Sequence, residues 1–467
     1  MSQTAETQYE LKPNNKGATS PVRHPAWRMF VHSLIGAEIS VCARYFERVI
    51  SLCRGSQDDT PLYKMIESPE HQVMESIDSV VEQIKSHPDY NAVVLNGTFN
   101  YEHDIEGMLR SLWEAMSRTS RIIAVIYNPY FRGLYHLANK LGIRQSEEPT
   151  TFVTSIDLQN IAKLAGFEIV RIRPVGLLPW RLGGIGTLIN RVFAAIPVLR
   201  YLGLAWVVIM RPVKPEVHKP SLSIVIPARN ERGNIESALT RMPDLGVVPE
   251  IIFVEGHSND GTWEEIERVA EKYRDKFPIQ CFKQTGKGKA DAVRLGFSKA
   301  TGELLTILDA DLTMPPELLG RFYGAWCSGL ADFINGNRLV YPMEGEAMKF
   351  LNWLGNIFFA KALSFVLDSR LGDSLCGTKL ISKRDYQRFV AWRRDFGDFD
   401  PFGDFELIYP ACSLGLGIVD VPIRYRDRVY GTTNIRRFYH GMMLFKMTWF
   451  GFCHIKISPA PKIQKLR

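Results

Sequence analysis

Short apolar runs that alternate with helical segments are the feature that most constrains how this chain can fold. In the C-terminal half, runs with the length of strands occupy Leu222–Ile226, Glu250–Glu255, Ile279–Phe282, Leu304–Leu308 and Ala331–Gly336. Helices are expected from Asn234, whose side chain can cap a helix, from beyond Thr262, and over Lys289–Lys299 and Pro316–Ser328. Helical crossovers between strands predict a doubly wound α/β sheet.

The N-terminal half carries the same alternation. Strands are expected at Ala92–Leu95, Arg121–Ile126, Phe167–Ile172 and Leu204–Ile209, and helices at Asp104–Met116 and Ser155–Ala165. Residues 28–53 are interpreted instead as an amphipathic helix. The predicted fold class is therefore α/β in both halves.

A chain of 467 residues is too long for one ordinary hydrophobic core, so two domains are expected. The Pro- and Lys-rich stretch Arg211–Pro220 has the composition of a linker between them. The predicted organisation is a flexible tail at 1–20, an α/β domain at 21–213, a linker at 214–220, a second α/β domain at 221–440 and an apolar, then basic segment at 441–467.

Composition narrows the class of protein. A hydrophobic content of 46% with 23% charged residues is typical of a folded chain. The seven cysteines are scattered without the paired spacing of a zinc site, which favours a reducing compartment. Residues 1–20 lack the pattern of a secretory signal, and no run reaches about 18 apolar residues. We therefore expect a cytoplasmic protein, soluble or peripheral to a membrane.

Basic residues gather in the C-terminal part of the chain, whose overall net charge is +7. Nucleic acid, anionic lipid and phosphate-bearing substrates would each suit this bias. Arg424, Arg426 and Arg428 alternate with other residues, which predicts that they share one face of an extended strand. Guanidinium groups bind phosphate oxygens through two hydrogen bonds, so this face predicts a phosphate contact, with an ordinary charged strand face as the alternative.

Acidic loops follow three of the C-terminal strands. They contain Glu231, Glu255 with Asp260, and Asp309 with Asp311. Parallel strands place their carboxyl ends at one edge of a sheet, so these loops are expected to converge there. Asp309 and Asp311 predict a site for Mg²⁺ or Mn²⁺, since these ions bind one or two carboxylates together with phosphate oxygens. An Asp-x-Asp is more often a turn, but its position after an apolar strand favours the metal site.

Two further motifs leave alternatives open. Gly286–Lys289 precedes a helix without the spacing of a Walker loop, and Lys289 is interpreted as a phosphate contact or as part of a solvated turn. Asp404 and Glu406 lie near the start of an apolar helix. Either acid can serve as a general base, or Asp404 can cap the helix.

Taken in order, these loops resemble family 2 glycosyltransferases, which have the GT-A fold, over about residues 220–440. The resemblance rests on Ser223-Ile-Val-Ile-Pro-Ala-Arg-Asn-Glu231, Ser258-Asn-Asp-Gly-Thr262 and Ala300-Thr-Gly-Glu-Leu-Leu-Thr-Ile-Leu-Asp-Ala-Asp311. Asp373-Ser-Leu-Cys-Gly-Thr-Lys379 and Val421-Pro-Ile-Arg-Tyr-Arg-Asp-Arg-Val-Tyr-Gly431 resemble segments of the dolichyl-phosphate mannosyltransferase branch. The chain departs from the family at Glu255-Gly256, where two adjacent acids are usual.

The motifs above and the resemblance together predict roles for individual residues, with Lys289 and Arg426 taken from the motifs alone. Donor binding is expected at Pro227, Ala228, Asn230, Glu231, Glu255, Asp260, Lys289 and Asp309. Metal binding is expected at Asp309 and Asp311, acceptor binding at Asp373, Arg426 and Arg428, and catalysis at Asp404, Glu406 and Arg428.

The last strands of the N-terminal half, within about residues 90–213, resemble the C-terminal half of class I methyltransferases. That family opens with a strand, a glycine-rich turn and a helix beside its cofactor. The N-terminal residues show no such turn, so this domain is expected to be a truncated or degenerate, methyltransferase-like domain. A structural or docking role is favoured over methyl transfer.

Two aromatic segments, Ala347–Asp368 and Gly441–Ile455, are interpreted as helices that lie at a lipid interface. The alternative for both is a core helix or a dimer contact. The basic C-terminal residues would add attraction to anionic lipid.

The sequence as a whole predicts an inverting glycosyltransferase that uses Mn²⁺ or Mg²⁺ at the cytoplasmic face of a membrane. The expected donor is a nucleotide-diphosphate sugar, and the expected acceptor is a polyprenyl phosphate or another membrane-linked glycan. A homo-oligomer is left open, and no nucleic-acid partner is expected. Two alternatives are a non-catalytic glycan-assembly scaffold and an S-adenosylmethionine-dependent methyltransferase with an accessory C-terminal domain.

Overall fold

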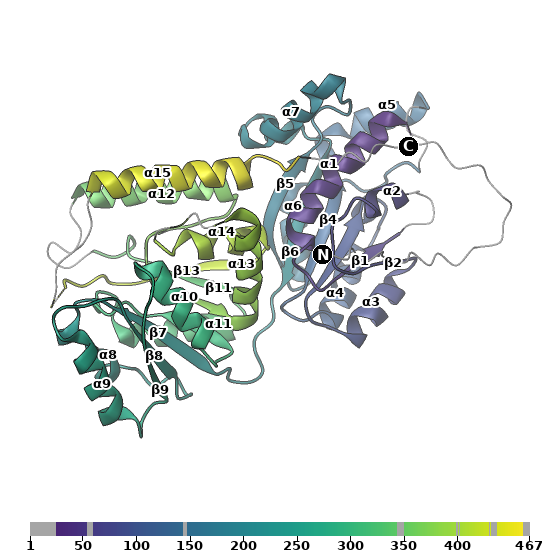
Figure 1. Cartoon of the computed structure of the whole chain (residues 1–467). Helices are drawn as coiled ribbons and strands as arrows, with labels where there is room; N and C mark the ends of the chain where they lie inside the picture. Colours follow the sequence, from purple (N-terminus) through teal and green to yellow (C-terminus); the bar gives the residue numbers. More distant parts are fainter. Residues whose placement is uncertain are drawn as a thin grey trace, which may run out of the picture. The chain divides into compact units, whose positions relative to one another are not determined.

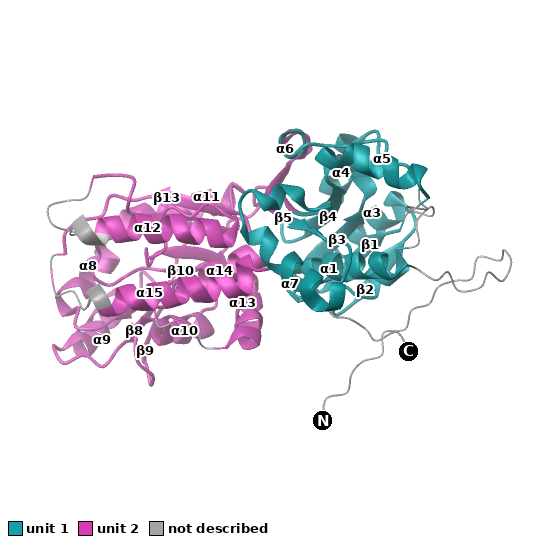
Figure 2. Cartoon of the chain, turned by 90° about the horizontal axis from the view of Figure 1, so that it is seen from above, with its two compact units in different colours: residues 1–158, 173–208, 458–467 teal, residues 159–172, 209–457 magenta. Residues whose placement is uncertain are grey.

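The computed structural model describes residues 25–53, 59–142, 147–342, 350–397, 400, 402–428, 430 and 437–460. The chain divides into two compact units (Figure 2). Unit 1 comprises Met1–Leu158, Arg173–Val208 and Ser458–Arg467, and unit 2 comprises Gln159–Ile172 and Ile209–Ile457. Neither unit is a single continuous segment of chain.

The N-terminal strands form a six-stranded sheet in the order β2-β1-β3-β4-β6-β5 (Figure 1). The strands are β1 (Arg48–Leu52), β2 (His71–Met74), β3 (Asn91–Asn96), β4 (Arg121–Tyr127), β5 (Phe167–Val175) and β6 (Ala205–Pro212). Strands β1 to β4 pair in parallel. The four strands predicted in this half coincide with β3, β4, β5 and β6, so its α/β class is confirmed.

Helices flank these strands along the chain. They are α1 (Ala26–Ala43), α2 (Thr60–Tyr63), α3 (Ile77–Ser86), α4 (Ile105–Ala115), α5 (Arg132–Lys140), α6 (Ser155–Leu164) and α7 (Ile185–Val192). The two helices predicted in this half coincide with α4 and α6. Asp104 caps α4, because its side chain accepts a hydrogen bond from the Gly107 N–H at 2.8 Å.

The prediction of one amphipathic helix over residues 28–53 is wrong beyond Ala43. Helix α1 ends there, and Arg48–Leu52 forms the fully buried strand β1. Its polar side chains are satisfied inside the fold, since Arg48 donates to the His87 carbonyl at 2.7 Å and Ser51 contacts His71 Nε2 at 2.7 Å. A short run buried on both faces lacks the alternation that marks a strand, so periodicity could not separate it from the helix before it.

The C-terminal strands form a seven-stranded sheet in the order β13-β11-β12-β10-β7-β8-β9. The strands are β7 (Leu222–Ala228), β8 (Glu250–Glu255), β9 (Ile279–Lys283), β10 (Leu304–Ile307), β11 (Phe333–Asn337), β12 (Lys379–Ser382) and β13 (Ile418–Pro422). All pairs are parallel except those of β12, which runs antiparallel to β10 and β11. The predicted α/β sheet is confirmed, and β12 makes it a mixed sheet.

The helices of this half are α8 (Ile235–Thr240), α9 (Thr262–Tyr273), α10 (Lys289–Lys299), α11 (Leu319–Cys327), α12 (Phe350–Leu367), α13 (Lys383–Phe396), α14 (Phe405–Ser413) and α15 (Arg437–Gly451). Helix α8 begins beside Asn234, but the prediction that Asn234 caps it is wrong. A 3₁₀ turn over Arg232–Asn234 gives this residue a helical backbone, and its amide donates to Glu231 Oε2 at 2.7 Å instead.

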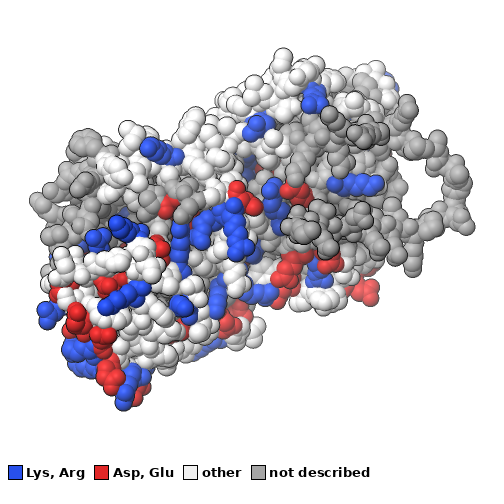
Figure 3. Space-filling view, in the orientation of Figure 1, with Lys and Arg blue, Asp and Glu red and all other residues white. Residues whose placement is uncertain are grey.

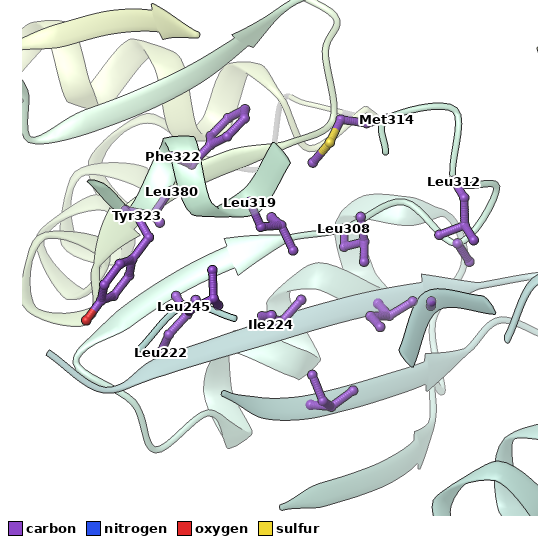
Figure 4. Close-up of a cluster of buried hydrophobic side chains, with 14 of the residues drawn as sticks. Leu222, Ile224, Leu245, Leu308, Leu312, Met314, Leu319, Phe322, Tyr323 and Leu380 are labelled. Atoms are coloured by element: carbon purple, nitrogen blue, oxygen red, sulfur yellow. The ribbon is translucent and has the colours of Figure 1, made fainter. Parts of the chain in front are cut away.

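Buried aliphatic and aromatic side chains fill one face of the second sheet (Figure 4). Leu222, Ile224, Leu304, Phe322 and Leu380 belong to this cluster, so strands β7, β10 and β12 and helix α11 share one core. This core fixes the strands whose carboxyl ends carry the acidic loops. The loops are thereby attached to close-packed strands of unit 2.

Helices α12 and α15 lie side by side (Figure 1), and Phe445 of α15 contacts Phe358 and Phe359 of α12. Lys456, which follows α15, forms a buried ion pair of 2.6 Å with Asp368 at the end of α12. Within the described part of the chain, no helix has both the length and the apolar character needed to cross a membrane.

Gly296 allows α10 to approach the second sheet closely. A Cβ atom at this position would lie 2.4 Å from Val225 Cγ1 of β7. Gly296→Ala is therefore expected to lower the free energy of unfolding by about 1–3 kcal/mol, because neither partner has room to move. The matched control is Gly324→Ala in α11, where an added Cβ meets no atom within 4 Å. That change should stabilise the protein by up to about 1 kcal/mol through helix propensity. Equal effects of the two changes in chemical denaturation would contradict the packing argument.

Candidate active site

Hydrogen bonds join the loops that follow β7 and β8. The Asn230 N–H donates to Ser258 Oγ at 2.9 Å, and the Asn259 N–H donates to Asn230 Oδ1 at 3.0 Å. The backbone continues this pairing, since the Gly256 N–H donates to the Ala228 carbonyl at 2.9 Å. Asn230 has a positive φ of 57°, a conformation that Asn tolerates better than most residues. The predicted convergence of these two loops is confirmed.

Arg428 ties two acids of different loops together. Its guanidinium lies 2.5 Å from Asp311 Oδ2, in the loop after β10, and 3.5 Å from Glu231 Oε1, in the loop after β7. Asp311 is also held by Thr313, whose hydroxyl donates to Asp311 Oδ1 at 2.8 Å. Three segments far apart in sequence therefore meet at the carboxyl edge of the sheet.

Burial changes the proton affinity of Glu231. Burial raises its pKa to about 7, against the lowering effects of the Asn234 hydrogen bond and of Arg428. Its own backbone N–H donates to Thr262 Oγ1 at 2.9 Å, which fixes the loop relative to α9. Near neutral pH this carboxyl is therefore divided between its neutral and charged forms.

Asp309 is paired with Lys289, the first residue of α10. Burial disfavours the charge on Asp309, but the Lys289 ammonium outweighs it and lowers the pKa of this carboxyl. Asp309 and Lys289 are 28% and 34% exposed, so the pair can be reached from solvent. The structure thus brings the predicted metal acids together with the basic residue of the Gly286–Lys289 motif.

Asp404 forms a second acid–base pair, with Lys379 at 2.5 Å. Its side chain does not cap α14. Asp400 does so instead, since its Oδ2 accepts from the N–H groups of Phe405 and Glu406 at 2.7 and 3.0 Å. The capping alternative for Asp404 is therefore wrong, because the preceding turn places Asp400 over the free N–H groups.

Glu406 and Asp373 are held in ion pairs by buried or half-buried arginines. Glu406 accepts hydrogen bonds from Arg294 and from Arg393, at 2.5 and 3.1 Å. Asp373 is fully buried and receives two hydrogen bonds from Arg338, at 2.6 and 2.9 Å. Both carboxylates are engaged in these pairs, and their roles in catalysis and in acceptor binding stay predictions.

The prediction that Arg424, Arg426 and Arg428 share one face of a strand is wrong. Strand β13 ends at Pro422, and the arginines lie in the segment beyond it. Arg424 and Arg426 are exposed, whereas Arg428 is half-buried against Asp311 and Glu231. The attraction of these two acids turns Arg428 inward. The Gly431 of the matched segment lies outside the described residues.

The remaining predicted donor contacts shape the loops. Pro227 and Ala228 end β7, and Ala228 is buried. Glu255 is buried and accepts a hydrogen bond from the Ser258 N–H at 2.5 Å. Asp260 accepts from the Thr262 N–H at 3.1 Å and from the Tyr430 hydroxyl at 3.2 Å. Their role in donor binding stays a prediction.

A divalent cation needs several oxygen ligands, and carboxylates are its usual protein ligands. Among the described residues, no group of three or more His, Cys, Asp or Glu side chains is arranged to hold a metal ion. Asp309 and Asp311 alone offer carboxylate oxygens close in sequence at the loop after β10. Mg²⁺ and Mn²⁺ are commonly held by one or two carboxylates with phosphate oxygens and water, so this pair fits an ion that is shared with a diphosphate.

Three residues of the site were not identified from the sequence. They are Lys379, Arg338 and Asp400, each of which neutralises or caps a group that the sequence did single out. Lys379 ends the motif Asp373–Lys379, so its position was visible but its partner was not. A buried ion pair joins residues far apart in sequence, and no local pattern marks it.

Comparisons with known proteins locate this edge within a recognised segment. Residues 223–389 match the family model described as Glycosyl transferase family 2. The matched segment lies wholly within unit 2. It includes β7, β8 and β10 and the acids that follow them, whereas Asp404 and Arg428 lie beyond its end.

Curated relatives match a similar part of the chain. A dolichol-phosphate mannosyltransferase of Pyrococcus furiosus is 34% identical over 228 residues, which are 46% of this chain and 59% of that protein. One of Saccharomyces cerevisiae is 33% identical over 107 residues, 22% of this chain and 39% of that protein. The chain thus spans less than two thirds of the length of either relative. A dolichyl-phosphate hexose transferase of Haloferax volcanii is 28% identical over 228 residues, 48% of this chain and 91% of that protein.

Among solved structures, a mannosyltransferase from Pyrobaculum calidifontis in complex with GDP-Man and Mn²⁺ is 19% identical, with a TM-score of 0.34. The match covers 49% of this chain and 62% of that chain.

Asp400 gives the folded protein a measurable pH dependence. Burial raises its pKa from 3.8 to about 6, so the folded state binds a proton that the unfolded state has already released. The free energy of unfolding should therefore fall as pH rises from about 4 to about 6, by at most about 3 kcal/mol from this residue. Asp400→Asn removes that titration, so the difference in stability between wild type and variant should shift in favour of the variant across this range. A constant difference in thermal unfolding from pH 4 to 7 would contradict the assignment.

Proposed function

We propose that unit 2 transfers a sugar from a nucleotide-diphosphate donor to a polyprenyl phosphate or another membrane-linked glycan, with inversion at the sugar carbon. The observation that carries this proposal is the convergence of Glu231, Asp311 and Arg428 within hydrogen-bonded loops at the carboxyl ends of the strands. In open α/β sheets this edge is where ligands bind. The match to the glycosyl transferase family 2 model and the dolichol-phosphate relatives support the chemistry.

Asp309 and Asp311 are the residues that would hold Mn²⁺ or Mg²⁺. Such an ion would neutralise the charge that develops on the departing diphosphate. Arg428 lies beside Asp311 and can bind phosphate through two hydrogen bonds, while Lys289 offers a point charge on the other acid. The edge thus carries acids for a cation and bases for a diphosphate within one group of side chains.

The acceptor needs little help from a base if it is a polyprenyl phosphate. Its oxygen is already an anion near neutral pH, so it can attack the sugar carbon as the bond to the diphosphate breaks on the opposite face. The ammonium of Lys379 keeps Asp404 paired, which suits a carboxylate that positions substrate. For a hydroxyl acceptor, Asp404 is the acid that we propose as general base, because Glu406 is held by two arginines.

Donor specificity stays open at the second strand. Glu255 is the acid there, followed by Gly256, and it already accepts a hydrogen bond from its own loop. We propose that Asp260 and Asn230 share nucleotide recognition with it. A loss of this recognition would leave the scaffold alternative, which predicts neither donor hydrolysis nor transfer.

For unit 1 we propose a methyltransferase-like α/β domain with a docking role. In the parallel order β2-β1-β3-β4, the chain adds β2 on one side of β1 and β3 on the other side. The carboxyl end of the sheet between β1 and β3 is the position at which open α/β sheets bind ligands. The loop that follows β1 includes residues 54–58, which lie outside the described residues. Saturable binding of S-adenosylmethionine would instead favour the methyltransferase alternative.

We also propose that α12 and α15 rest on the cytoplasmic surface of a membrane. Their exposed side chains include Phe358, Met442, Phe445 and Trp449, which are 51%, 60%, 54% and 66% exposed. Exposed lysines Lys361 and Lys446 lie on the same helices. Figure 3 shows few charged side chains where these helices lie in Figure 1. Aromatic and methionine side chains flanked by lysines suit the boundary between lipid headgroups and acyl chains.

The transferase proposal is tested with purified full-length protein, several nucleotide sugars including GDP-mannose and UDP-glucose, and short polyprenyl phosphates. We expect transfer that requires Mn²⁺ or Mg²⁺, and a fall in kcat/KM of about 100-fold or more for the double change Asp309→Ala with Asp311→Ala. The matched control removes two exposed acids of the same unit, Glu271→Ala with Asp275→Ala, which are 72% and 100% exposed. Full turnover after loss of Asp309 and Asp311 would refute the assigned roles. Absence of turnover with every donor would favour the scaffold.

The membrane surface is tested by sedimentation with vesicles that contain anionic lipid. Phe445→Glu with Trp449→Glu should lower the bound fraction at least severalfold, because each change places a charge at the lipid boundary. Val248→Glu, at an apolar residue of unit 2 that is 65% exposed, supplies the control. If the double variant and Val248→Glu bind vesicles equally, the membrane proposal fails. If the double variant has a different oligomeric state from the wild type, the exposed face of α12 and α15 contacts a second copy of the chain instead of lipid.

A further inference from the structure

Basic side chains neutralise the acids at the sheet edge. Asp309 is paired with Lys289, Asp311 with Arg428, and Asp404 with Lys379. In each pair the two partners come from different elements or loops. The acids that are proposed to hold a metal ion are therefore already paired with basic side chains of the same protein.

The pair of Asp309 and Lys289 differs from the others in how easily it can open. Lys379 is 1% exposed and its partner Asp404 is 11% exposed, so that pair is enclosed. Lys289 and Asp309 are 34% and 28% exposed. The lysine side chain is a flexible stem with a single charged nitrogen, and it can turn away without movement of the backbone. Arg428, by contrast, contacts Asp311 and Glu231 at once.

Gly377 shows how closely the protein fits around this pair. A Cβ atom at residue 377 would lie 2.1 Å from Lys289 Nζ and 2.2 Å from Asp309 Oδ2. Only a glycine leaves room for the two charged groups at this point. One side of the pair is thus covered by the backbone at residue 377, while both side chains remain part-exposed.

We propose that Lys289 is the resting counter-ion of Asp309, that a divalent cation must displace it, and that the displaced ammonium then binds the diphosphate of the donor. This inference rests on the proposed function of the site. Its consequence is that cation and nucleotide favour each other. The cation alone must separate Lys289 from its partner, whereas a diphosphate offers the ammonium a new one.

Simple electrostatics supports the displacement. A Mg²⁺ ion needs a carboxylate oxygen at about 2.0–2.1 Å, and Lys289 Nζ is already paired with Oδ1 of Asp309. Two positive groups at neighbouring positions repel each other strongly in a site that is partly shielded from water. Removal of the lysine charge should therefore strengthen binding of the cation alone. The nucleotide should then add less to the cation affinity of this variant, because the ammonium that its diphosphate would draw away from Asp309 is absent.

The test compares Mn²⁺ binding by calorimetry in wild type, Lys289→Met and Lys287→Met, each without nucleotide and with saturating GDP or UDP. Lys287 is exposed in the loop before α10, two residues from Lys289, so its replacement removes the same charge and leaves the Asp309–Lys289 pair in place. Without nucleotide, Lys289→Met should bind Mn²⁺ about fivefold more tightly or better, and Lys287→Met should bind it as wild type does. The gain in Mn²⁺ affinity that the nucleotide gives should be smaller in Lys289→Met than in wild type. Thermal unfolding confirms that each variant is folded.

Unchanged or weaker Mn²⁺ binding in folded Lys289→Met would overturn the inference, as would an equal gain in Lys287→Met. An unchanged nucleotide effect would overturn the transfer of the ammonium to the diphosphate. These outcomes are separate from failure of the proposed function. If the wild-type protein transfers no sugar but Lys289→Met binds Mn²⁺ more tightly, the counter-ion role of Lys289 stands and the proposed transferase activity fails.

Discussion

The contact of Arg428 with Asp311 and Glu231 is the interaction on which the candidate site depends. It joins the loops after β7 and β10 to the segment beyond β13, which are separated by long stretches of chain. Without a basic group between them, two acids this close would repel each other, and burial would favour their neutral forms. The raised pKa of Glu231 shows that burial still exceeds the effect of Arg428 there. At Glu231, burial and the Arg428 charge thus act in opposite directions.

The fold was predictable wherever an apolar run had the length of a strand and polar residues at its ends. Glu250–Glu255 and Lys289–Lys299 coincide with β8 and α10 at both ends. Strand β1 was missed because it is short, buried on both faces and follows a buried helix, so no change of period marks it. The antiparallel β12 was missed for a different reason. Strand direction depends on which neighbours a strand meets, and the residues Lys379–Ser382 carry no signal for that.

The site was predictable in its members but not in their pairing. Residues that follow strands in an α/β sheet must gather at one edge, so Glu231, Asp309 and Asp311 could be chosen from position alone. Arg428 was chosen for its motif, but the strand inferred for it does not exist, because Ile423 to Arg428 follow β13 as irregular backbone. Lys379 and Arg338 could not be chosen. A basic residue in a sequence resembles a solvated one until the structure shows the acid beside it.

A site that binds both a divalent cation and a diphosphate must contain acids and bases close together, and this has a cost when neither ligand is bound. The acids and bases then bind each other, as Asp309 and Lys289 do here. Either ligand alone must break such a pair and leave one side chain without a partner. The two ligands together give both side chains new partners, the cation for the acid and the diphosphate for the base. The close packing of α10 on β7 at Gly296 fixes the backbone that carries Lys289, so the change is confined to its side chain. In the displacement proposed above, selectivity for the complete pair of ligands comes from the exchange of partners at Asp309 and Lys289.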